Sequence, residues 1–223
     1  MNWKHLFAVI GLGIISTLPS AAQTYAWTDW TSATTGQSGV AAGSLQWGSS
    51  SVNVSYSGEI LFANTNGGSN YWLPTAIYTS AAVPNSPLSP DGIFLQGGWG
   101  VTQRITFSQP VMNPALTILS LGRPTIECRY VFNQPFNIAS QGQGYWGGTS
   151  NSLVKSGNTL IGTEGHGTIV FPGLHTSLTW TAPYQESWHG FQVGAMRAVP
   201  EPATMSALAL GCIALARRKK RRA

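Results

Sequence analysis

S-V-N-V-S-Y, residues 51–56, alternates polar and apolar side chains one by one, and V-T-Q-R-I-T-F, residues 101–107, follows the same pattern. A period of two puts every second side chain on one face of a β-strand, so that face can enter a core while the other meets water. L-T-I-L-S-L, residues 116–121, continues the series and ends at the breaker Gly122-Arg123-Pro124. The alternation predicts strands in the middle of the chain.

Similar runs recur between turn residues at a spacing of about 8–12 residues, which is typical of all-β domains. They are Ile126–Phe132, Thr159–Thr163, Thr168–Phe171, Ser177–Trp180 and Gly190–Met196. No stretch of ten residues in this region keeps a helical stripe without a Gly or Pro, and no fixed repeat period supports a propeller or solenoid. We therefore predict one all-β domain over residues 23–198, a two-sheet, jelly-roll-like sandwich of about ten short strands.

The charge distribution argues against nucleic acid as a partner. Only 9% of the 223 residues are Asp, Glu, Lys or Arg, well below the roughly 25% of ordinary soluble domains. The formal net charge of +5 comes from the C-terminal end, since five basic and six acidic residues lie between Gln23 and Val199. The domain therefore has no basic surplus to attract a polyanion.

The N-terminus has the three parts of a signal peptide over residues 1–22. Lys4 and His5 are followed by the apolar run Leu6–Ile15, the helix breaker Pro19 and the small residues Ser20-Ala21-Ala22. We expect an N-terminal signal helix, cleavage by signal peptidase and a mature chain that begins at Gln23. The alternative, an uncleaved membrane anchor, is disfavoured by the short apolar run.

The C-terminal residues 199–223 also have three parts. Pro200-Glu201-Pro202 is held extended because each proline fixes φ and disfavours helix in the residue before it. Ala203–Ala216 is an apolar run that spans roughly 21 Å as a helix, so a transmembrane helix here needs snorkelling at its ends. A basic stop-transfer run follows and should stay cytoplasmic. It consists of Arg217, Arg218, Lys219, Lys220, Arg221 and Arg222.

This order of parts resembles the PEP-CTERM family of exported proteins, through Pro200-Glu201-Pro202, the apolar run and the arginine-rich end. The resemblance implies an exosortase as processing enzyme and a Gram-negative-type envelope, often with exopolysaccharide production. It implies transient anchoring in the inner membrane with the domain outside, followed by a place at the cell surface or in the extracellular matrix.

The domain more loosely resembles secreted, anchor-bearing β-sandwich domains. One matching stretch is a strand–loop–strand over Ile105–Val111, Asn113-Pro114 and Leu116–Gly122; another is Gly162–Phe171 with Trp188–Phe191. This resemblance implies no catalytic residues.

A search for catalytic motifs favours a protein that is not an enzyme and needs no cofactor. The chain contains no G-x-S-x-G, G-x-x-x-x-G-K-[ST] or H-E-x-x-H motif. A glycosidase pair would have to come from its carboxylates, and their spacing brings no two together. Those carboxylates are Glu59, Asp91, Glu127, Glu164 and Glu186, with Asp29 as the sixth.

Three weaker features were weighed as sites. Glu164 and His166 share one strand face and could form a metal site with His175 or His189, although a polar strand end explains them equally. Asp91-Gly92 follows three prolines and reads as a turn, with a structural calcium ion as the alternative. Cys128 reads as a small buried hydrophobe. We therefore predict no metal site.

Three tryptophans lie in glycine-rich loops and are candidate glycan-binding residues: Trp72 in GGSNYW, Trp99 in QGGWG and Trp146 in QGQGYWGG. An indole on a loop can stack on the apolar face of a sugar ring. The alternative is that each one plugs the end of the sandwich. Five others, Trp27, Trp30, Trp47, Trp180 and Trp188, are expected mainly in the core.

Three hypotheses of function follow, of which the last, an enzyme that acts on polysaccharide, would require two of the carboxylates to cluster across a groove. The first is an envelope or matrix protein without catalytic activity. The alternative is a lectin-like module that contacts exopolysaccharide.

Overall fold

The computed structural model describes residues 24–198. The signal peptide with its predicted helix, the motif Pro200-Glu201-Pro202, the predicted transmembrane helix and the run Arg217–Arg222 lie outside the described residues. Within them, the predicted all-β class is confirmed, and the single helical element is the 3-10 turn η1, Thr75–Tyr78. None of the helices in this part of the chain is long and apolar enough to span a membrane.

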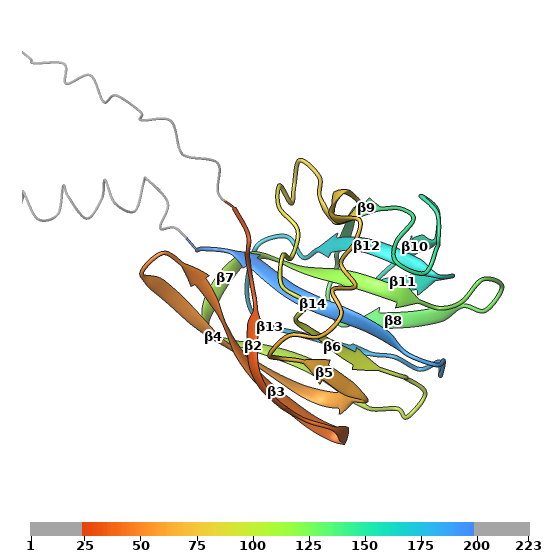
Figure 1. Cartoon of the computed structure of the whole chain (residues 1–223), viewed down its shortest axis with the longest axis horizontal. Helices are drawn as coiled ribbons and strands as arrows, with labels where there is room; N and C mark the ends of the chain where they lie inside the picture. The colour runs from red at the N-terminus through yellow and green to blue at the C-terminus, as the bar shows by residue number, and fades with distance from the viewer. Residues whose placement is uncertain (1–23, 199–223) are drawn as a thin grey trace, which may run out of the picture.

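Fourteen strands make up the domain (Figure 1). Their bounds are β1 Ala26–Trp27, β2 Asp29–Thr34, β3 Gly36–Trp47, β4 Ser50–Ile60, β5 Phe62–Asn64, β6 Gly92–Leu95, β7 Thr102–Leu121, β8 Cys128–Phe132, β9 Asn137–Gln141, β10 Leu153–Ser156, β11 Thr159–Gly162, β12 Gly165–Val170, β13 Leu174–Thr181 and β14 His189–Met196.

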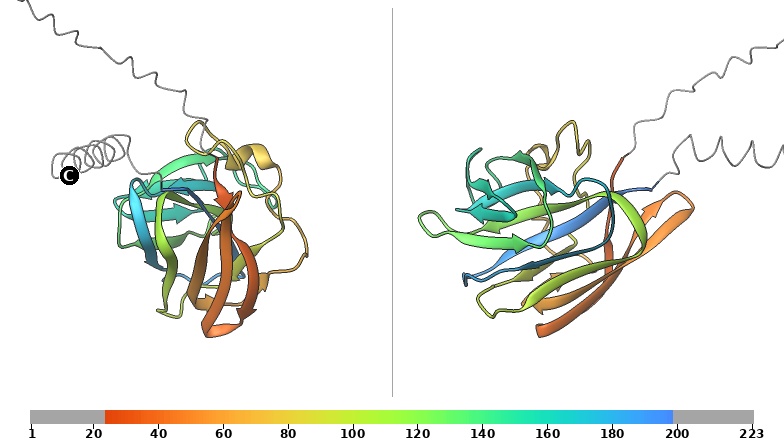
Figure 2. Two further views of the ribbon diagram at one scale, coloured as in Figure 1. Left: turned by 90° about the vertical axis from the view of Figure 1, so that its left-hand side faces the viewer. Right: turned by 180° about the vertical axis from the view of Figure 1, so that it is seen from behind.

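Hydrogen bonds join all fourteen strands into one antiparallel sheet, so the predicted division into two separate sheets is not confirmed. The reason is β7, which is 20 residues long. Its first part, up to Phe107, lies between β4 and β13, and its last part, from Ala115, lies between β12 and β14. Figure 2 shows β7 arching over at the end of the domain where the chain termini leave.

The arch corrects the expected strand–loop–strand over residues 105–122. Those residues form one strand, which bends where Asn113 adopts a positive φ of 47°. The ladder to β13 shifts register between His175 and Ser177, and the ladder to β14 shifts between Gly194 and Met196. β7 carries extra residues in both ladders, because five of its steps face two of β13 and three of its steps face two of β14. Such bulges bend a ladder without ending it, which explains why a loop signal in the sequence lies inside a strand.

The main core lies between the two parts of the sheet that β7 joins. Val54 and Tyr56 of β4 point into it while Ser55 is exposed, which confirms the alternation of residues 51–56. Ile118 of β7 enters the same core from the other part. Leu119, on the opposite face, packs with Trp72 and other rings in a second cluster. The last part of β7 is therefore covered on both faces.

The two ends of the described chain lie side by side. β1 pairs with β14 in antiparallel fashion, with Ala26 opposite Ala195. Thr24 and Ala198 therefore lie at the same end of the domain. The first residues of the domain and the point where the C-terminal tail begins are therefore close together.

Candidate functional site

Trp72, one of the three candidate glycan-binding residues, is buried with an exposed fraction of 0%. Its indole Nε1 donates a hydrogen bond to the carbonyl oxygen of Asp91 at 2.9 Å, and its ring meets that of Tyr78 at 5.7 Å. The Trp72 ring packs with Leu119 of β7 in the second hydrophobic cluster, together with Tyr78 and Phe94. This placement corrects the expectation for Trp72, because a buried ring offers no face to a ligand.

Trp146 lies instead in a surface group of rings. Trp146 is 42% exposed and its neighbour Tyr145 is 51% exposed. The ring centroid of Trp146 lies 4.9 Å from that of Tyr71, 4.6 Å from that of Tyr145 and 4.7 Å from that of Trp188. We call Tyr71, Tyr145, Trp146 and Trp188 the aromatic platform.

Three of these four rings, Tyr71, Tyr145 and Trp188, are not among the glycan-binding residues that the sequence predicts. Tyr71 and Tyr145 each directly precede a tryptophan that was chosen, in N-Y-W and G-Y-W. That repeated dipeptide was the available signal. Their meeting could not be read from the sequence, because residues 71, 145 and 188 are brought together only by the fold.

The platform rests on rings that belong to the sheet. Phe94 of β6 contacts Trp188 at 5.5 Å and Tyr71 at 5.7 Å between centroids, both with steep interplanar angles. Phe62 of β5 stacks on Phe94 at 4.4 Å and meets Trp188 at 5.3 Å. Edge-to-face and offset contacts of this kind stabilise aromatic pairs beyond their buried area. The inner side of the platform is therefore fixed by the strands.

The loop that carries Tyr145 and Trp146 lies on a buried polar group formed by Ser120, Glu164 and His166. His166 Nε2 is 3.2 Å from Glu164 Oε1, and the Ser120 hydroxyl donates to the same oxygen at 2.5 Å. The Ser120 backbone N–H donates to His166 Nδ1 at 3.3 Å. Nδ1 is thus an acceptor, and the Nε2–H group donates a hydrogen bond to Glu164 Oε1.

The backbone of this loop packs directly against the imidazole ring of His166. A Cβ atom on Gly144 would lie 2.3 Å from His166 Cγ, so only glycine fits there. The Gly142 N–H donates to the His166 carbonyl oxygen at 3.2 Å. Ser120 and Glu164 both adopt a positive φ, 53° and 60°, so two non-glycine residues are held in a sparsely populated conformation beneath the loop.

Trp99 is 51% exposed and stands apart from the platform, with no ring–ring contact to another described residue. It follows Gly97 and Gly98, whose φ values of 79° and 82° require glycine. Glu59 anchors the base of this loop by accepting the N–H groups of Gln96 and Gly97. Trp99 therefore lacks the neighbouring rings that make up the platform and is not part of it.

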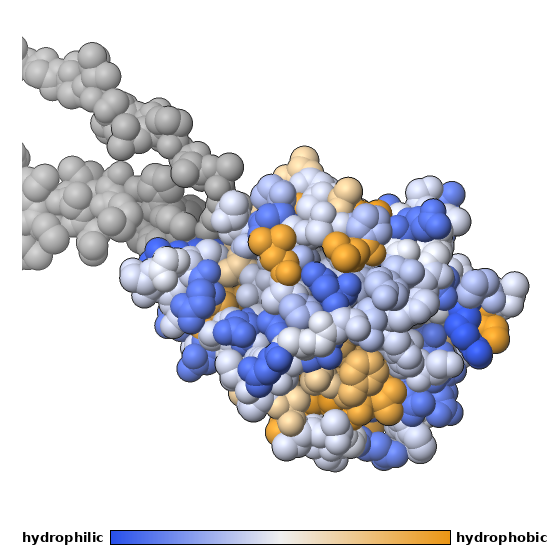
Figure 3. All heavy atoms as spheres, in the orientation of Figure 1, coloured by the Kyte–Doolittle hydropathy of each residue, from blue (hydrophilic) through white to orange (hydrophobic). Residues whose placement is uncertain are grey.

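Figure 3 shows where the surface is most hydrophobic in one view. Apolar colour gathers over the part of the face where Figure 1 draws β5, and most of the remaining surface is white or blue. Leu61, which directly precedes β5, is 40% exposed. The hydropathy scale used there ranks Trp and Tyr as mildly hydrophilic, so colour alone does not mark the platform.

The carboxylates considered for a glycosidase pair are each engaged locally. Glu59 binds the backbone of Gln96 and Gly97, Asp91 accepts the Ser89 hydroxyl, Glu127 pairs with Arg129, Glu164 binds Ser120 and His166, and Glu186 accepts the Gly122 N–H and contacts His189. Burial raises the pKa of Asp91, partly offset by the hydrogen bond from Ser89. In these positions the carboxylates tie loops to strands.

The two histidines weighed as additional metal ligands lie with other partners. His175 Nε2 is 3.0 Å from the Pro172 carbonyl oxygen, and His189 Nδ1 is 2.8 Å from Glu186 Oε1. Glu164 Oε1 and His166 Nε2 do pair, at 3.2 Å, but Glu164 lies just before β12 at a positive φ and does not share a strand face with His166. Across residues 24–198, no three His, Cys, Asp or Glu side chains are arranged to hold a metal ion.

Cys128 is expected to resist alkylation in the folded chain. Burial, followed by the nearby Glu186 carboxylate, raises the pKa of its thiol to about 12, so at pH 8 the reactive thiolate is scarce. In a Cys212→Ala chain, which leaves one thiol, iodoacetamide should label Cys128 at least ~100-fold more slowly before than after unfolding in guanidinium. Mass spectrometry measures the rate, and equally fast labelling in the native state would contradict the burial.

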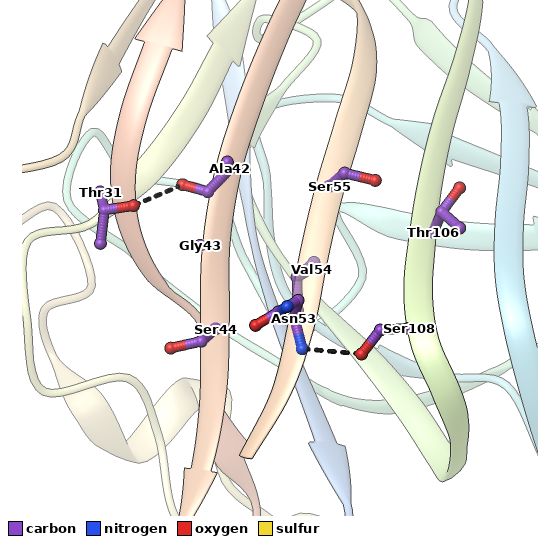
Figure 4. Close-up of a pocket in the computed structure, with 9 residues that line it drawn as sticks. All are labelled: Thr31, Ala42, Gly43, Ser44, Asn53, Val54, Ser55, Thr106 and Ser108. Atoms are coloured by element: carbon purple, nitrogen blue, oxygen red, sulfur yellow. Dashed lines mark hydrogen bonds between the residues drawn. The ribbon is translucent and has the colours of Figure 1, made fainter.

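A separate hollow of about 500 Å³ lies on the outer face of β2, β3, β4 and β7 (Figure 4). Ala42 and Gly43 have the smallest side chains along β3 in this hollow. The Thr31 hydroxyl donates to the Ala42 carbonyl oxygen at 3.2 Å. The Asn53 N–H donates to the Ser108 hydroxyl at 3.0 Å. Its lining residues are Thr31, Ala42, Gly43, Ser44, Asn53, Val54, Ser55, Thr106 and Ser108. None of them titrates near neutral pH, so this hollow offers no acid–base pair.

The C-terminal tail begins directly after the last strand. β14 ends at Met196, and Pro200-Glu201-Pro202, the apolar run and the basic run come next in the sequence. Residues 198–222 match the PEP-CTERM protein-sorting motif. The PEP-CTERM motif implies export, exosortase processing and sorting to the cell envelope or surface. The match covers the tail alone, and the chain matches no curated protein and no solved structure.

Proposed function

We propose that this chain is an exosortase-sorted protein of the cell envelope or extracellular matrix whose β-domain has no catalytic activity of its own. The observation that carries the proposal is the PEP-CTERM motif at residues 198–222. Arg197 alone separates the end of β14 from this motif, so the whole folded domain is the cargo that the tail sorts.

The route runs through the inner membrane. Signal peptidase releases the N-terminus, while Ala203–Ala216 enters the bilayer and Arg217–Arg222 remain cytoplasmic. Six residues, from Arg197 to Pro202, connect β14 to the apolar run and span at most ~20 Å when extended. The domain is thus held close outside the membrane until the exosortase cuts.

The engagement of the carboxylates supports a non-catalytic domain. Glu186 and Glu59, both buried, each accept backbone N–H groups that fix loops. A general acid or base instead has to reach a substrate proton within hydrogen-bond distance. Because both carboxylates bind the backbone of their own chain, their arrangement fits a structural protein of the envelope or matrix.

The second candidate function is a lectin-like module that binds exopolysaccharide. The observation that favours it is the aromatic platform, in which Tyr145 and Trp146 remain about half exposed although they contact other rings. Such rings can stack on sugars while neighbouring amides bind hydroxyl groups.

Intact-mass measurement of the released protein tests the sorting proposal. The secreted or surface fraction of the native host should contain a chain that begins at Gln23 and lacks Arg217–Arg222, because signal peptidase and exosortase have removed the two ends. The membrane fraction should contain the species that still carries the basic run. A released chain with all 223 residues would contradict both processing steps.

A further inference from the structure

We propose that Tyr71, Tyr145 and Trp146 form a preformed stacking surface for the rings of a neutral polysaccharide, and that half-buried Ser120 with buried Glu164 and His166 positions it. The inference deepens the lectin-like candidate above and is independent of the sorting route. It names the contacting rings, the class of ligand and the residues that hold the loop.

The geometry of the rings favours stacking with a ligand. Tyr145 meets Tyr71 nearly edge-on, at 88°, whereas Trp146 is tilted by 37° to Tyr71 and lies 4.9 Å from it. The rings thus present faces in more than one direction on one surface. Tyrosine and tryptophan combine an apolar face with a polar tip, so they can remain half exposed and still bind a partly polar ligand.

The sequence around the platform favours a neutral ligand. Residues 65–76 and 140–152, which carry Tyr71, Tyr145 and Trp146, contain no Asp, Glu, Lys or Arg. They contain Asn, Gln, Ser and Thr, and exposed Ser69 and Gln143 lie two residues from the platform tyrosines. Uncharged donors and acceptors match sugar hydroxyls, whereas a uronate or phosphate would call for Arg or Lys.

The buried polar group makes the surface rigid. Gly144 rests on the imidazole of His166, and Gly144 and Gly147 exchange two backbone hydrogen bonds, at 2.6 and 3.2 Å, across Tyr145 and Trp146. The Ser120 N–H and the Glu164 carboxylate hydrogen-bond the two ring nitrogens of that imidazole. A loop fixed before binding loses less conformational entropy when the ligand arrives, so its affinity is higher.

Affinity electrophoresis of the processed chain tests the proposal. The gels contain β-1,3-glucan, hydroxyethyl cellulose, xylan or galactomannan as neutral probes, and alginate as a charged one. At least one neutral gel should retard the wild-type chain. Trp146→Ala should weaken binding roughly tenfold, which is about 1.4 kcal/mol. Tyr145→Ala should weaken it less, because phenol offers a smaller ring face than indole.

Trp99→Ala is the matched control, because Trp99 is also about half exposed but makes no contact with the platform. It should bind as the wild type does. Trp146→Phe keeps an aromatic face and should show intermediate affinity. Retardation by no neutral gel, or by alginate alone, would overturn the neutral-sugar assignment, and loss on Trp99→Ala with no loss on Trp146→Ala would move the site elsewhere. None of these results bears on the processed mass that tests sorting.

The positioning role has its own readout. Ser120→Ala removes the hydroxyl that donates to Glu164 without touching the platform. Its affinity should fall several-fold, and acrylamide should quench the fluorescence of Trp146 more strongly, because the loop is less fixed. The signal of Trp146 is the difference between a chain that has Trp146 and the same chain with Trp146→Phe. This difference is measured once with Ser120 and once with Ser120→Ala, and the two are compared. Unchanged affinity and quenching would remove the positioning role and leave the stacking surface standing.

Discussion

Replacing Pro200-Glu201-Pro202 by three alanines is expected to leave the full-length precursor in the membrane fraction. Alanine favours helix, whereas each proline fixes φ and lacks an N–H group, so the variant lets the apolar helix extend toward the domain. The segment loses its extended shape and its recognition residues together, while Ala203–Arg222 still anchors the chain. Immunoblots against the domain should show almost no released form.

Serine in place of Arg217–Arg222 is the complementary variant. The apolar run is short, so the basic residues supply much of its retention, at roughly 1 kcal/mol each near anionic lipid. This variant should pass into the released fraction unprocessed, whereas the alanine variant stays in the membrane unprocessed. If the alanine variant is instead processed and sorted like the wild type, the motif is no sorting signal here, and the tail acts only as a weak hydrophobic anchor.

Trp30→Ala is expected to lower the free energy of unfolding of the domain by about 3–5 kcal/mol. Trp30 is fully buried in the main core, and its indole Nε1 donates to Gln192 Oε1 at 2.8 Å. Alanine leaves a cavity and takes one donor from a buried amide, whose own NH₂ group still donates to the Thr28 carbonyl oxygen. For a domain of this size the melting temperature should fall by roughly 10 °C.

Trp99→Ala removes the same side chain from an exposed loop and should change stability by no more than about 0.5 kcal/mol. Trp30→Phe keeps most of the buried volume and loses the hydrogen bond, so its loss should lie between the two. Urea titrations followed by circular dichroism measure all three. Equal midpoints for Trp30→Ala and Trp99→Ala would contradict the placement of Trp30.

The parts of the fold that the sequence predicts well are those whose side chains alternate cleanly. Val52, Val54 and Tyr56 enter the core as their spacing requires, and the tail is a linear signal that needs no folding to be read. β3 was not predicted, because Gly36–Trp47 is rich in Gly, Ala and Ser and its small side chains blur the period of two. β3 is held in strand conformation by its hydrogen bonds to β4 rather than by the β-propensity of its own residues.

The candidate site was predictable only in part, for a physical reason. A glycine-rich loop indicates that its backbone packs closely against another part of the fold, but it does not identify the residue that it contacts. Trp72 and Trp146 lie in similar sequences, and one is buried under its own segment while the other reaches the surface. The difference depends on the cover over β7 and on His166, which lie far from these loops in sequence.

The continuity between β14 and the tail also has a mechanical consequence. β14 is bonded along one edge to β7 and along the other to β6 and β1. If the tail is held at the cell surface and drag acts on the loops at the opposite end, tension runs along the axis of β14 and loads its ladders in shear. Hydrogen bonds loaded in shear must fail together, whereas those loaded by peeling fail one at a time. The strand that carries the sorting tail is therefore well placed to bear a pull.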